Sequence, residues 1–485
     1  MDFPIFHLDW LGDRMLIAVI AILHVIINHA LAVGFIPLVT LLEYLGYRKR
    51  KYHYEQAMQW DELARKLMFV AFIITTTIGA LTGVGIWFSA ALVNPAAIGS
   101  LIRVFYGAWF SEWIVFVLEV VFVMIYFLSW KKSTQSEAGK LKHIRFGAFL
   151  SLFSWLTMAI IVGILGFMME PGSWLSNKTF LSGFANPLYI PQLYFRTPLA
   201  MMMGGALALF LVLFFLKKGN AIREQAISYL SLWLLIWSPV CVVGAILYRA
   251  VIPEAMLGNL PTAVATMAFS NWYSWLLMII IGAVLLAIVV ALWGFLLPKR
   301  LPAVALIIPF LALCLFLGSF ERIREFIRKP YVIGKYMYAN GLRVEDYPLF
   351  QKNGVLPYAS YVSTPEVTAE NKIAAGKNIF MLTCSRCHTI NGINSVITKC
   401  RNRFAPLPGQ VLTAEPIKTY IPQMHKVWYY IPPFPGNAAE LDALVAFIIQ
   451  MDQAPQPVLG AQDEGVTITP PQRVNTLLNK TNKGS

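Results

Sequence analysis

Apolar runs long enough to cross a lipid bilayer fill the first two thirds of the chain. The first run is Met15–Tyr44, and further runs follow at about 66–93, 104–130, 144–169, 197–216, 226–250, 265–297 and 301–319. About 20 predominantly apolar residues are enough to span the hydrocarbon core as a helix. The pattern therefore predicts an all-α fold whose first part, residues 1–335, is a polytopic bundle of about eight transmembrane helices.

Basic residues are concentrated in alternate loops between these runs. The basic loops lie at 48–51, 131–145, 217–223 and 299–300, whereas the loops at 94–103, 170–196 and 251–264 carry little positive charge. Loops rich in Lys and Arg face the cytoplasm in membrane proteins. This rule places the N-terminus on the outer side, and an even number of spans places residues 320–485 there as well.

The last third of the chain has the pattern of a small soluble helical domain. Residues 368–383 and 437–451 read as amphipathic helices, and Asn437 is a candidate N-cap of the second. We expect this domain at 365–455, after a linker rich in Tyr, Pro and Gly at 336–364. The tail at 456–485 is rich in Pro, Gln, Thr and Asn, a composition typical of extended or disordered chain.

The soluble domain carries one motif with specific chemistry. Cys384-Ser385-Arg386-Cys387-His388 has the form C-x-x-C-H, in which two thiols bind a haem covalently and the histidine ligates its iron. A zinc pair or a redox dithiol is the alternative. Zinc needs a second pair of ligands, and nearby the sequence offers only Cys400, Met424 and His425. We therefore predict one covalent haem c, and the helix–motif–loop–helix order resembles a class I cytochrome c domain.

The second axial ligand of this haem is open from the sequence. The position that usually holds a methionine is Ile431, while Met424 and His425 lie six to seven residues earlier. A methionine ligand raises the haem potential and a second histidine lowers it. Haem c is attached outside the energised membrane, so the motif and the loop charges independently predict a periplasmic C-terminal domain on a bacterial inner membrane protein.

Composition and charge narrow the functional class. The chain has 485 residues, of which 58% are hydrophobic and 13% charged, with a net charge of +14. Because the basic residues lie in short loops between apolar runs, the charge indicates membrane topology and does not indicate nucleic-acid binding. Of the five cysteines, Cys241 and Cys314 lie in apolar runs and Cys400 has no partner among the rest, so the count implies no disulfide framework.

Ionisable residues inside membrane spans are expensive and point to function. His24 and His29 lie in the first span, five residues or about 500° of helix rotation apart, so they face different sides. We favour His24 as a haem ligand over His29; the alternative for each is a hydrogen bond to a neighbouring helix. Glu112 and Glu119 are seven residues apart on one face of the third span, which suits a proton relay, iron ligation or a buried ion pair.

The membrane part resembles subunit I of cytochrome bd oxidases over about residues 1–335. The resemblance rests on the order and spacing of several short features: the first span with Arg14 and His24, the Gly79–Gly83 helix, the third span with Glu112 and Glu119, the segment Gly166–Trp174, and Glu325-x-x-Arg328-x-Pro330-Tyr331. The final transmembrane helix of that family is missing, and the cytochrome c domain stands in its place.

The resemblance implies roles for these residues by position. His24 matches a haem ligand, Glu325 the ligand of a high-spin haem b, and Glu112 and Glu119 the carboxylates tied to haem and proton delivery, with a spacing one residue shorter here. Arg328 belongs to the end of the family's GRQPW motif. The implied membrane cofactors are one or more haems b, with haem d also open.

Two departures from the family pattern concern electron input. Met278 matches the methionine ligand of the low-spin haem b; from its surroundings alone it reads as apolar filler. Its histidine partner aligns with Arg196, which snorkels, or pairs with a haem propionate, but does not ligate iron. The outer loop Val251–Val264, where the family binds quinol, has only about a dozen residues.

These features lead to a primary hypothesis and two alternatives. The first is a bd-like oxidase subunit that takes electrons from a periplasmic cytochrome c or another redox protein and reduces oxygen. The second is an electron-transfer subunit without oxygen chemistry, in which quinone remains an open partner; the third is an inert membrane anchor. The resemblance also implies a second membrane subunit, and the apolar spans imply contact with membrane lipid.

Overall fold

The computed structural model describes residues 4–265, 273–362, 364–407 and 409–453. The chain divides into two compact units. The membrane unit comprises Ile17–Phe88 and Ser100–Tyr336, and the C-terminal unit comprises Met337–Ser485 together with Met1–Leu16 and Ser89–Gly99. The tail expected at 456–485 lies outside the described residues.

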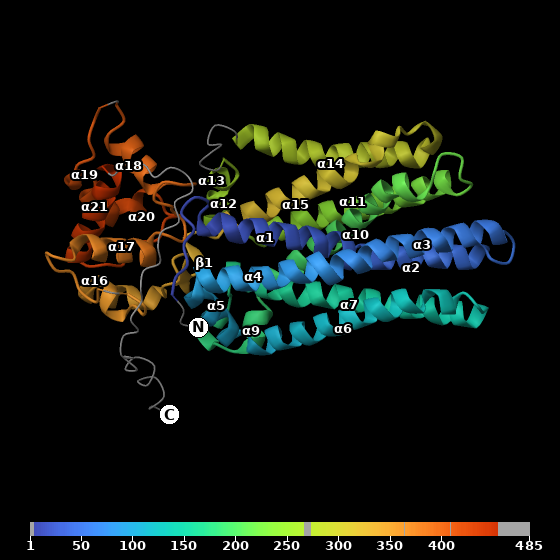
Figure 1. Ribbon diagram of the computed structural model, residues 1–485, viewed down its shortest axis with the longest axis horizontal. Coiled ribbons are helices and arrows are strands. Elements are labelled where there is room, and N and C mark those ends of the chain that lie inside the picture. The colour runs from blue at the N-terminus through green and yellow to red at the C-terminus, as the bar shows by residue number, and fades with distance from the viewer. Residues whose placement is uncertain (1–3, 266–272, 363, 408, 454–485) are drawn as a thin grey trace. The chain divides into compact units, whose positions relative to one another are not determined.

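Helices, most of them long, make up the membrane unit and the segments that lead into it (Figure 1). They are α1 Asp13–Ile27, α2 Phe35–Lys49, α3 Tyr54–Ile74, α4 Ala80–Val93, α5 Pro95–Val104, α6 Tyr106–Ser133, α7 Glu137–Met169, α8 Trp174–Asn177, α9 Phe180–Phe184, α10 Tyr189–Phe215, α11 Arg223–Val251, α12 Glu254–Gly258, α13 Leu260–Ala265, α14 Tyr273–Leu296 and α15 Ile308–Ile327. Two π-helical turns, η1 Asn28–Val33 and η2 Thr75–Gly79, interrupt the first two long helices, and short 3₁₀ turns η4 Pro298–Arg300 and η5 Ala303–Leu306 precede α15. The strand β1 Tyr331–Ile333 follows α15.

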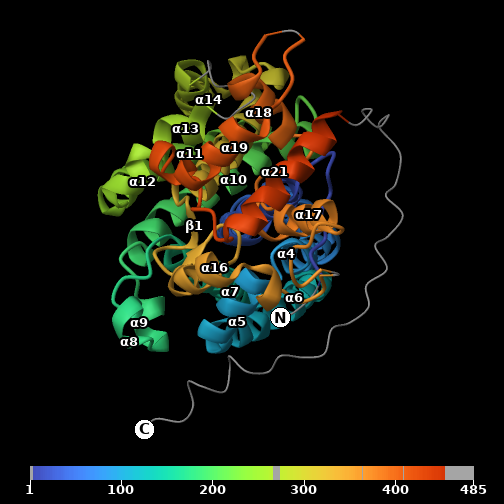
Figure 2. The same cartoon turned by 90° about the vertical axis from the view of Figure 1, so that its left-hand side faces the viewer.

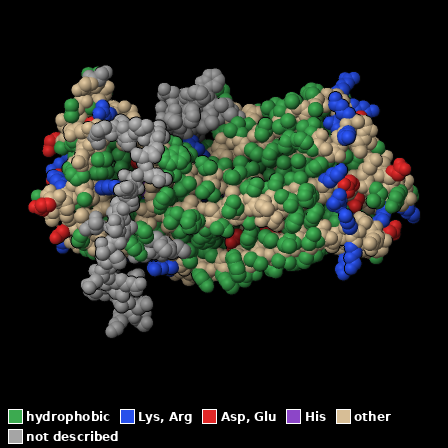
Figure 3. Space-filling model, viewed as in Figure 1, with side chains coloured by type: hydrophobic (Ala, Val, Ile, Leu, Met, Phe, Trp, Pro, Cys, Tyr) green, Lys and Arg blue, Asp and Glu red, His purple; other side chains and the backbone are tan. Residues whose placement is uncertain are grey.

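The prediction of an all-α transmembrane bundle is confirmed. Within the described residues, seven helices are long and apolar enough to cross a membrane: Asp13–Lys49, Tyr54–Val93, Tyr106–Ser133, Glu137–Met169, Tyr189–Phe215, Arg223–Val251 and Ala303–Ile327. The remaining predicted run, 265–297, which is the seventh along the chain, falls partly outside the described residues, and its described part includes the apolar stretch Ile280–Leu296. Apolar side chains cover most of the face of the bundle that Figure 3 shows, as expected where helices face lipid.

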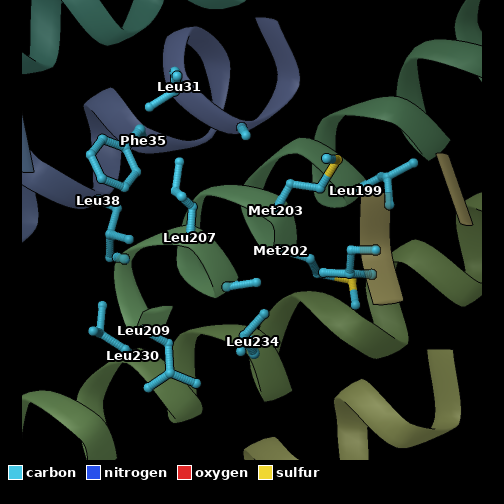
Figure 4. Close-up of a cluster of buried hydrophobic side chains, with 14 of the residues drawn as sticks. Leu31, Phe35, Leu38, Leu199, Met202, Met203, Leu207, Leu209, Leu230 and Leu234 are labelled. Atoms are coloured by element: carbon cyan, nitrogen blue, oxygen red, sulfur yellow. The ribbon is translucent and has the colours of Figure 1, made fainter. Parts of the chain in front are cut away.

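Helix α10 forms the centre of the bundle. In the most apolar 18-residue stretch of α10, 78% of the window is buried. The corresponding share is 44% or less in each of the other six membrane helices. Its side chains Leu199, Met203 and Leu207 pack against η1, α2 and α11 (Figure 4). The backbones cross closely at Gly34, because a Cβ there would lie 1.9 Å from the carbonyl oxygen of Ala200. Small residues at such crossings are what lets membrane helices approach each other.

The four basic loops predicted from the sequence lie at one end of the membrane unit. Polar contacts join them: Lys49 Nζ donates to Gln225 Oε1 at 2.7 Å, Arg50 Nη2 donates to the carbonyl of Thr134 at 2.8 Å, and Lys299 pairs with Glu224 at 3.8 Å. Lys and Arg side chains gather at this end beyond the apolar surface (Figure 3). We refer to it as the basic end; which side of the membrane it faces remains a prediction.

The C-terminal unit contains shorter helices around its own core (Figure 2). They are α16 Tyr347–Asn353, α17 Lys372–Thr383, α18 Val396–Phe404, α19 Ala414–Tyr420, α20 Met424–Val427 and α21 Ala438–Gln453, with the strand β2 Met337–Tyr338 and the 3₁₀ turns η6 Val344–Asp346, η7 Leu356–Tyr358 and η8 Ile421–Gln423. The helices predicted at 368–383 and 437–451 are α17 and α21. Asn437 caps α21 as predicted, since its Oδ1 accepts from Glu440 N at 3.0 Å.

Most of the segment that composition assigned to a linker, 336–364, packs within the C-terminal unit, which begins again at Met337. The backbone N–H groups of Val355 and Leu356 donate to the Glu440 carboxylate at 2.8 and 2.9 Å. Leu356 is buried in the same hydrophobic cluster as Phe380 and Leu444. The segment is therefore held to α21 by both a buried carboxylate and apolar contact.

Candidate functional site

The C-x-x-C-H motif forms a tight turn at the end of α17. The backbone N–H groups of Cys387 and His388 both donate to the carbonyl of Cys384 at 3.0 Å. His388 Nδ1 is 3.1 Å from the carbonyl oxygen of Asn394, so Nδ1 carries the proton and donates. Burial, and then the charge of Lys399, lower the pKa of His388 to about 4. The imidazole is therefore neutral, and within the described structure its Nε2 has no hydrogen-bond partner, which is the state that a haem-ligating histidine requires.

The loop after the motif fixes the carbonyl that orients His388. Asn394 adopts a left-handed backbone with a φ of 66°, which Asn tolerates better than most residues. Its side-chain Nδ2 donates to the carbonyl of Cys387. Ser395 then caps α18 by accepting from Thr398 N at 3.0 Å. Sequence reasoning did not single out Asn394; the Asn-Ser pair before a helix was the available signal.

The N-terminal segment binds the same loop within the C-terminal unit. The Asp9 carboxylate accepts from the backbone N–H groups of Ile390 and Asn391 at 2.5 and 3.1 Å. His7 lies between two carboxylates, 3.0 Å from Asp13 and 3.3 Å from Asp9. Burial lowers the pKa of His7, but hydrogen bonds to Asp13 and Asp9 outweigh it and raise the pKa to about 9. The role of Asp9 was not predicted, because Ile390 and Asn391 lie nearly four hundred positions away.

Met424 and His425, the two candidates for the second axial ligand, lie on the short helix α20. The Met424 side chain packs against the hydrophobic core of the C-terminal unit, as does Cys384. His425 Nδ1 donates to the carbonyl of Ile431 at 2.6 Å, and its ring lies 5.3 Å from that of Tyr429. Both ligand assignments remain predictions.

In the membrane unit, His24 is held in the same way as His388. Its Nδ1 lies 3.2 Å from both the carbonyl of Gly79 and Oγ1 of Thr82. The ring lies close to Gly83 on α4, since a Cβ there would lie 3.1 Å from His24 Cε1. Gly79 ends the π-helical turn η2, and such turns are frequent at functional sites. Among the described residues, His24 Nε2 has no hydrogen-bond partner, so it is free to bind a metal.

His29 is engaged at both ring nitrogens. Nδ1 donates to the carbonyl of Val25 at 3.0 Å, and Nε2 accepts from Nη1 of Arg196 at 3.4 Å. Arg196 in turn forms a buried ion pair with Glu321, whose second oxygen accepts from Arg324 at 3.0 Å. Glu321 was not predicted; an acidic residue in the last span, one helical turn before Glu325, was the available signal.

The two predicted carboxylates of α6 have different surroundings. Glu119 is buried and accepts from Thr157 Oγ1 on α7 at 2.8 Å. Glu112 is half-buried, and in the described part of the chain it makes neither a hydrogen bond nor an ion pair. Within the described residues, neither Glu112 nor Glu119 pairs with an arginine. The structure therefore does not show the buried ion pair that the sequence left as an alternative.

The remaining predicted residues lie around the end of α15 and on α14. Arg328 and Lys329 both pair with Glu325, the latter at 3.2 Å. Asn259 Nδ2 donates to the carbonyls of Ile327 and Lys329 at 3.1 and 2.8 Å, which holds the end of the helix. Met278 on α14 is 54% exposed. No group of three or more His, Cys, Asp or Glu residues that could hold a bare metal ion exists within the described ranges.

Comparison with known proteins supports the resemblance at the level of fold. No protein-family model and no curated protein matches the sequence. Among solved structures, the chain is similar to a chain of the bd oxidase from Geobacillus thermodenitrificans, with a TM-score of 0.56 and 16% identity over 68% of this chain and 90% of that chain. The protein has the fold of a bd oxidase chain. It is thus a bd-like integral membrane protein, and the low identity leaves its chemistry to be argued from its own residues.

Proposed function

We propose that the chain is a haem-carrying subunit of a bd-like terminal oxidase, which receives electrons from a periplasmic cytochrome c or a similar redox protein and reduces oxygen. One observation carries this proposal. His24 and His388, in different units, both have Nδ1 bound to a backbone carbonyl and Nε2 free of partners in the described structure. That arrangement fixes the tautomer and ring orientation of a metal-ligating histidine.

The residues of the C-terminal unit fit a covalent haem c. Cys384 and Cys387 would bind the macrocycle, and His388 would ligate the iron, with Met424 or His425 on the opposite face. His24 and Glu325 would hold haem b, or haem d, in the membrane unit. Bound haem supplies one-electron transfer and, where a coordination position is open, oxygen binding.

The chain's own groups would tune these sites. Arg328 and Lys329 orient the Glu325 carboxylate by donating to its two oxygens. The buried Glu119, with its Thr157 hydrogen bond, would hold a proton near the site of reduction. Covalent attachment of the cytochrome domain gives its haem a high effective concentration toward the membrane unit.

The proposal fixes the orientation of the protein in a bacterial inner membrane. Haem c is attached on the outer side, so the C-terminal unit would face the periplasm and the basic end the cytoplasm, which agrees with the charge rule. A second membrane subunit would complete the complex. It would cover the side of α6 on which Phe110, Trp113 and Val117 are exposed.

Oxygen uptake by the purified complex tests the proposal. With reduced cytochrome c as electron donor, we expect oxygen consumption that cyanide inhibits, a carbon monoxide difference spectrum, and a pyridine haemochrome count of one haem c plus at least one membrane haem. The variant Cys384→Ala/Cys387→Ala should lose the donor-driven activity while keeping the membrane haem. Membrane haems that bind neither cyanide nor carbon monoxide would contradict the oxidase function.

A second candidate function is electron transfer without oxygen reduction, in a larger respiratory complex that uses quinone or cytochrome c. The observation in its favour is the Arg196–Glu321 ion pair. It occupies the place where the family resemblance puts a haem-ligating histidine, so at least one electron-transfer step differs from that family. Low-spin haems that are inert to carbon monoxide would support this candidate.

A further inference from the structure

A cluster of buried ionisable groups lies near the basic end of the membrane unit, away from the haem-ligand candidates. Glu43 on α2 is its centre and is completely buried. Its Oε1 forms an ion pair with Lys140 Nζ at 2.5 Å and lies 2.6 Å from His143 Nδ1, and its Oε2 accepts from Tyr126 OH at 2.6 Å. Three helices, α2, α6 and α7, thus contribute to one hydrogen-bonded carboxylate.

The cluster continues from Glu43 toward the loops. Lys140 also pairs with Asp61 on α3, whose Oδ2 accepts from Trp130 Nε1 at 3.1 Å. Asp61 and Lys140 line a small cavity together with Arg50 and Thr134, which belong to the basic loops. A buried carboxylate is therefore connected, through Lys140 and Asp61, to the basic end of the bundle.

The geometry of His143 indicates that the cluster holds an exchangeable proton. Its Nδ1 faces the Glu43 carboxylate and its Nε2 faces the carbonyl oxygen of Tyr126 at 2.8 Å. Both neighbours are acceptors, and a neutral imidazole donates only once. Either His143 is an imidazolium or Glu43 is protonated. The pair therefore holds one proton more than a neutral histidine beside an ionised carboxylate would. Lys140 balances the charge of Asp61 when the histidine is charged.

Further polar side chains lie on α6 and α7 beyond the cluster, and we refer to them as the polar seam. On α6, Glu112, Glu119 and Tyr126 repeat every seven residues and share one face, which covers about 21 Å at 1.5 Å per residue. On α7, Ser154 and Thr157 lie beside Glu119.

Gly147 on α7 marks the point at which the cluster meets this seam. A Cβ there would lie 2.6 Å from Thr40 Oγ1 and 2.8 Å from Tyr126 OH, so only glycine lets the two hydroxyls approach α7. Thr40 Oγ1 and Tyr126 OH are themselves 3.4 Å apart. The hydrogen bonds of Glu43 therefore continue through Tyr126 to Thr40, one helical turn before Glu43 on α2.

We propose that the Glu43–His143–Lys140–Asp61 cluster loads protons from the basic end and passes them along this seam, by way of Tyr126, to Glu119. The proposal rests on the proposed function and names its proton source. Each oxygen molecule would take four electrons from four molecules of reduced cytochrome c and four protons through the seam, and two water molecules would form. A purely structural role for the cluster, as an ion-paired clamp between four helices, is the alternative that the experiment must separate.

The test measures proton uptake when the membrane haem is reduced, which needs no oxygen. The purified complex, with a pH-sensitive dye in weak buffer, is reduced rapidly under anaerobic conditions while haem absorbance and dye absorbance are followed together. Glu43→Gln removes the shared proton position, and Tyr126→Phe removes only one hydroxyl. Both variants should take up protons at least ~100-fold more slowly than the wild type, the lower end of what loss of a positioned proton donor costs.

Controls separate slow proton transfer from misfolding. Haem content and the rate of haem c reduction should be unchanged in both variants. Glu62→Gln is the matched control, since Glu62 lies next to Asp61 on α3 but pairs at the surface with Arg65 at 2.9 Å, and it should behave as the wild type. Tyr126→Phe keeps the aromatic packing, so it decides the matter if Glu43→Gln does not assemble.

The outcomes for the two proposals differ. Wild-type rates of proton uptake in Tyr126→Phe and in any folded Glu43→Gln, or a wild type that takes up no proton on haem reduction, would overturn the seam. A wild type that takes up protons on haem reduction but consumes no oxygen would overturn the oxidase function and leave the seam supported.

Discussion

Arg196 and Glu321 form a buried ion pair between α10 and α15, with Nη2 and Oε1 2.5 Å apart. The two side chains are 1% and 7% exposed. Arg324 and His29 extend the pair into a network that includes two guanidinium groups and one carboxylate. The family resemblance puts a haem-ligating histidine at the position of Arg196. A guanidinium does not ligate iron, so an ion-pair network occupies that position here.

Removing the carboxylate of this network should destabilise the membrane unit strongly. Glu321→Gln leaves Arg196 and Arg324 buried without their counter-charge, and breaking one partner of a buried pair costs about 3–5 kcal/mol. We expect a loss of this size in the free energy of unfolding of the purified protein, measured by denaturant titration in detergent. Glu62→Gln, at the exposed pair with Arg65, should cost less than about 1 kcal/mol. Equal stability of the two variants would contradict the importance of the buried network.

The sequence predicts those features that depend on local pattern. Apolar runs locate the membrane helices, Asn437 caps α21 as expected, and the alternating basic loops do share one end. It does not predict features that depend on which distant helices meet. Glu321, Glu43 and Asp9 looked like ordinary acidic residues, because their partners come from other helices or from the far end of the chain. The packed segment at 336–364 was missed for the same reason, since its buried acceptor is Glu440.

The contact between the N-terminal segment and the haem-motif loop should weaken at alkaline pH. The pKa of His7 is raised from 6.5 to about 9 by its hydrogen bonds to Asp13 and Asp9. A group whose pKa is higher in the folded state stabilises that state fully below its unfolded pKa, and this contribution is lost as the pH rises through the folded pKa. We therefore expect full stabilisation below about pH 6.5 and its loss as the pH rises to and beyond 9.

Hydrogen exchange at the loop measures this contact directly. The amides of Ile390 and Asn391, which donate to Asp9, should lose protection between about pH 7 and 10 beyond the intrinsic base-catalysed increase. His7→Gln cannot become charged, so its protection should be lower than that of the wild type at pH 6.5 and should lack this transition. A transition that persists in His7→Gln would assign the pH dependence to another group.

His24 and His29 should differ sharply in their effect on the membrane haem. Within the described ranges His24 Nε2 has no hydrogen-bond partner, whereas His29 Nε2 already accepts from Arg196. We expect His24→Ala to lose membrane haem in the pyridine haemochrome assay and to keep haem c. His29→Ala should keep both haems and lose about 1–3 kcal/mol of stability, because it removes the acceptor next to a buried guanidinium. Loss of membrane haem in His29→Ala alone would reverse the assignment.

Met424 should be the second axial ligand of haem c. Its side chain packs against the same hydrophobic core as Cys384, while His425 is held by its Nδ1 bond to Ile431 and by Tyr429. A methionine ligand raises the potential of haem c. Redox titration should therefore show a lower potential in Met424→Ala, with loss of the near-infrared absorption of a methionine–iron bond, and an unchanged band in His425→Ala. If His425→Ala instead alters the axial-ligand spectrum and Met424→Ala does not, the second ligand is the histidine. The potential of haem c would then be lower than we expect for electron transfer toward oxygen.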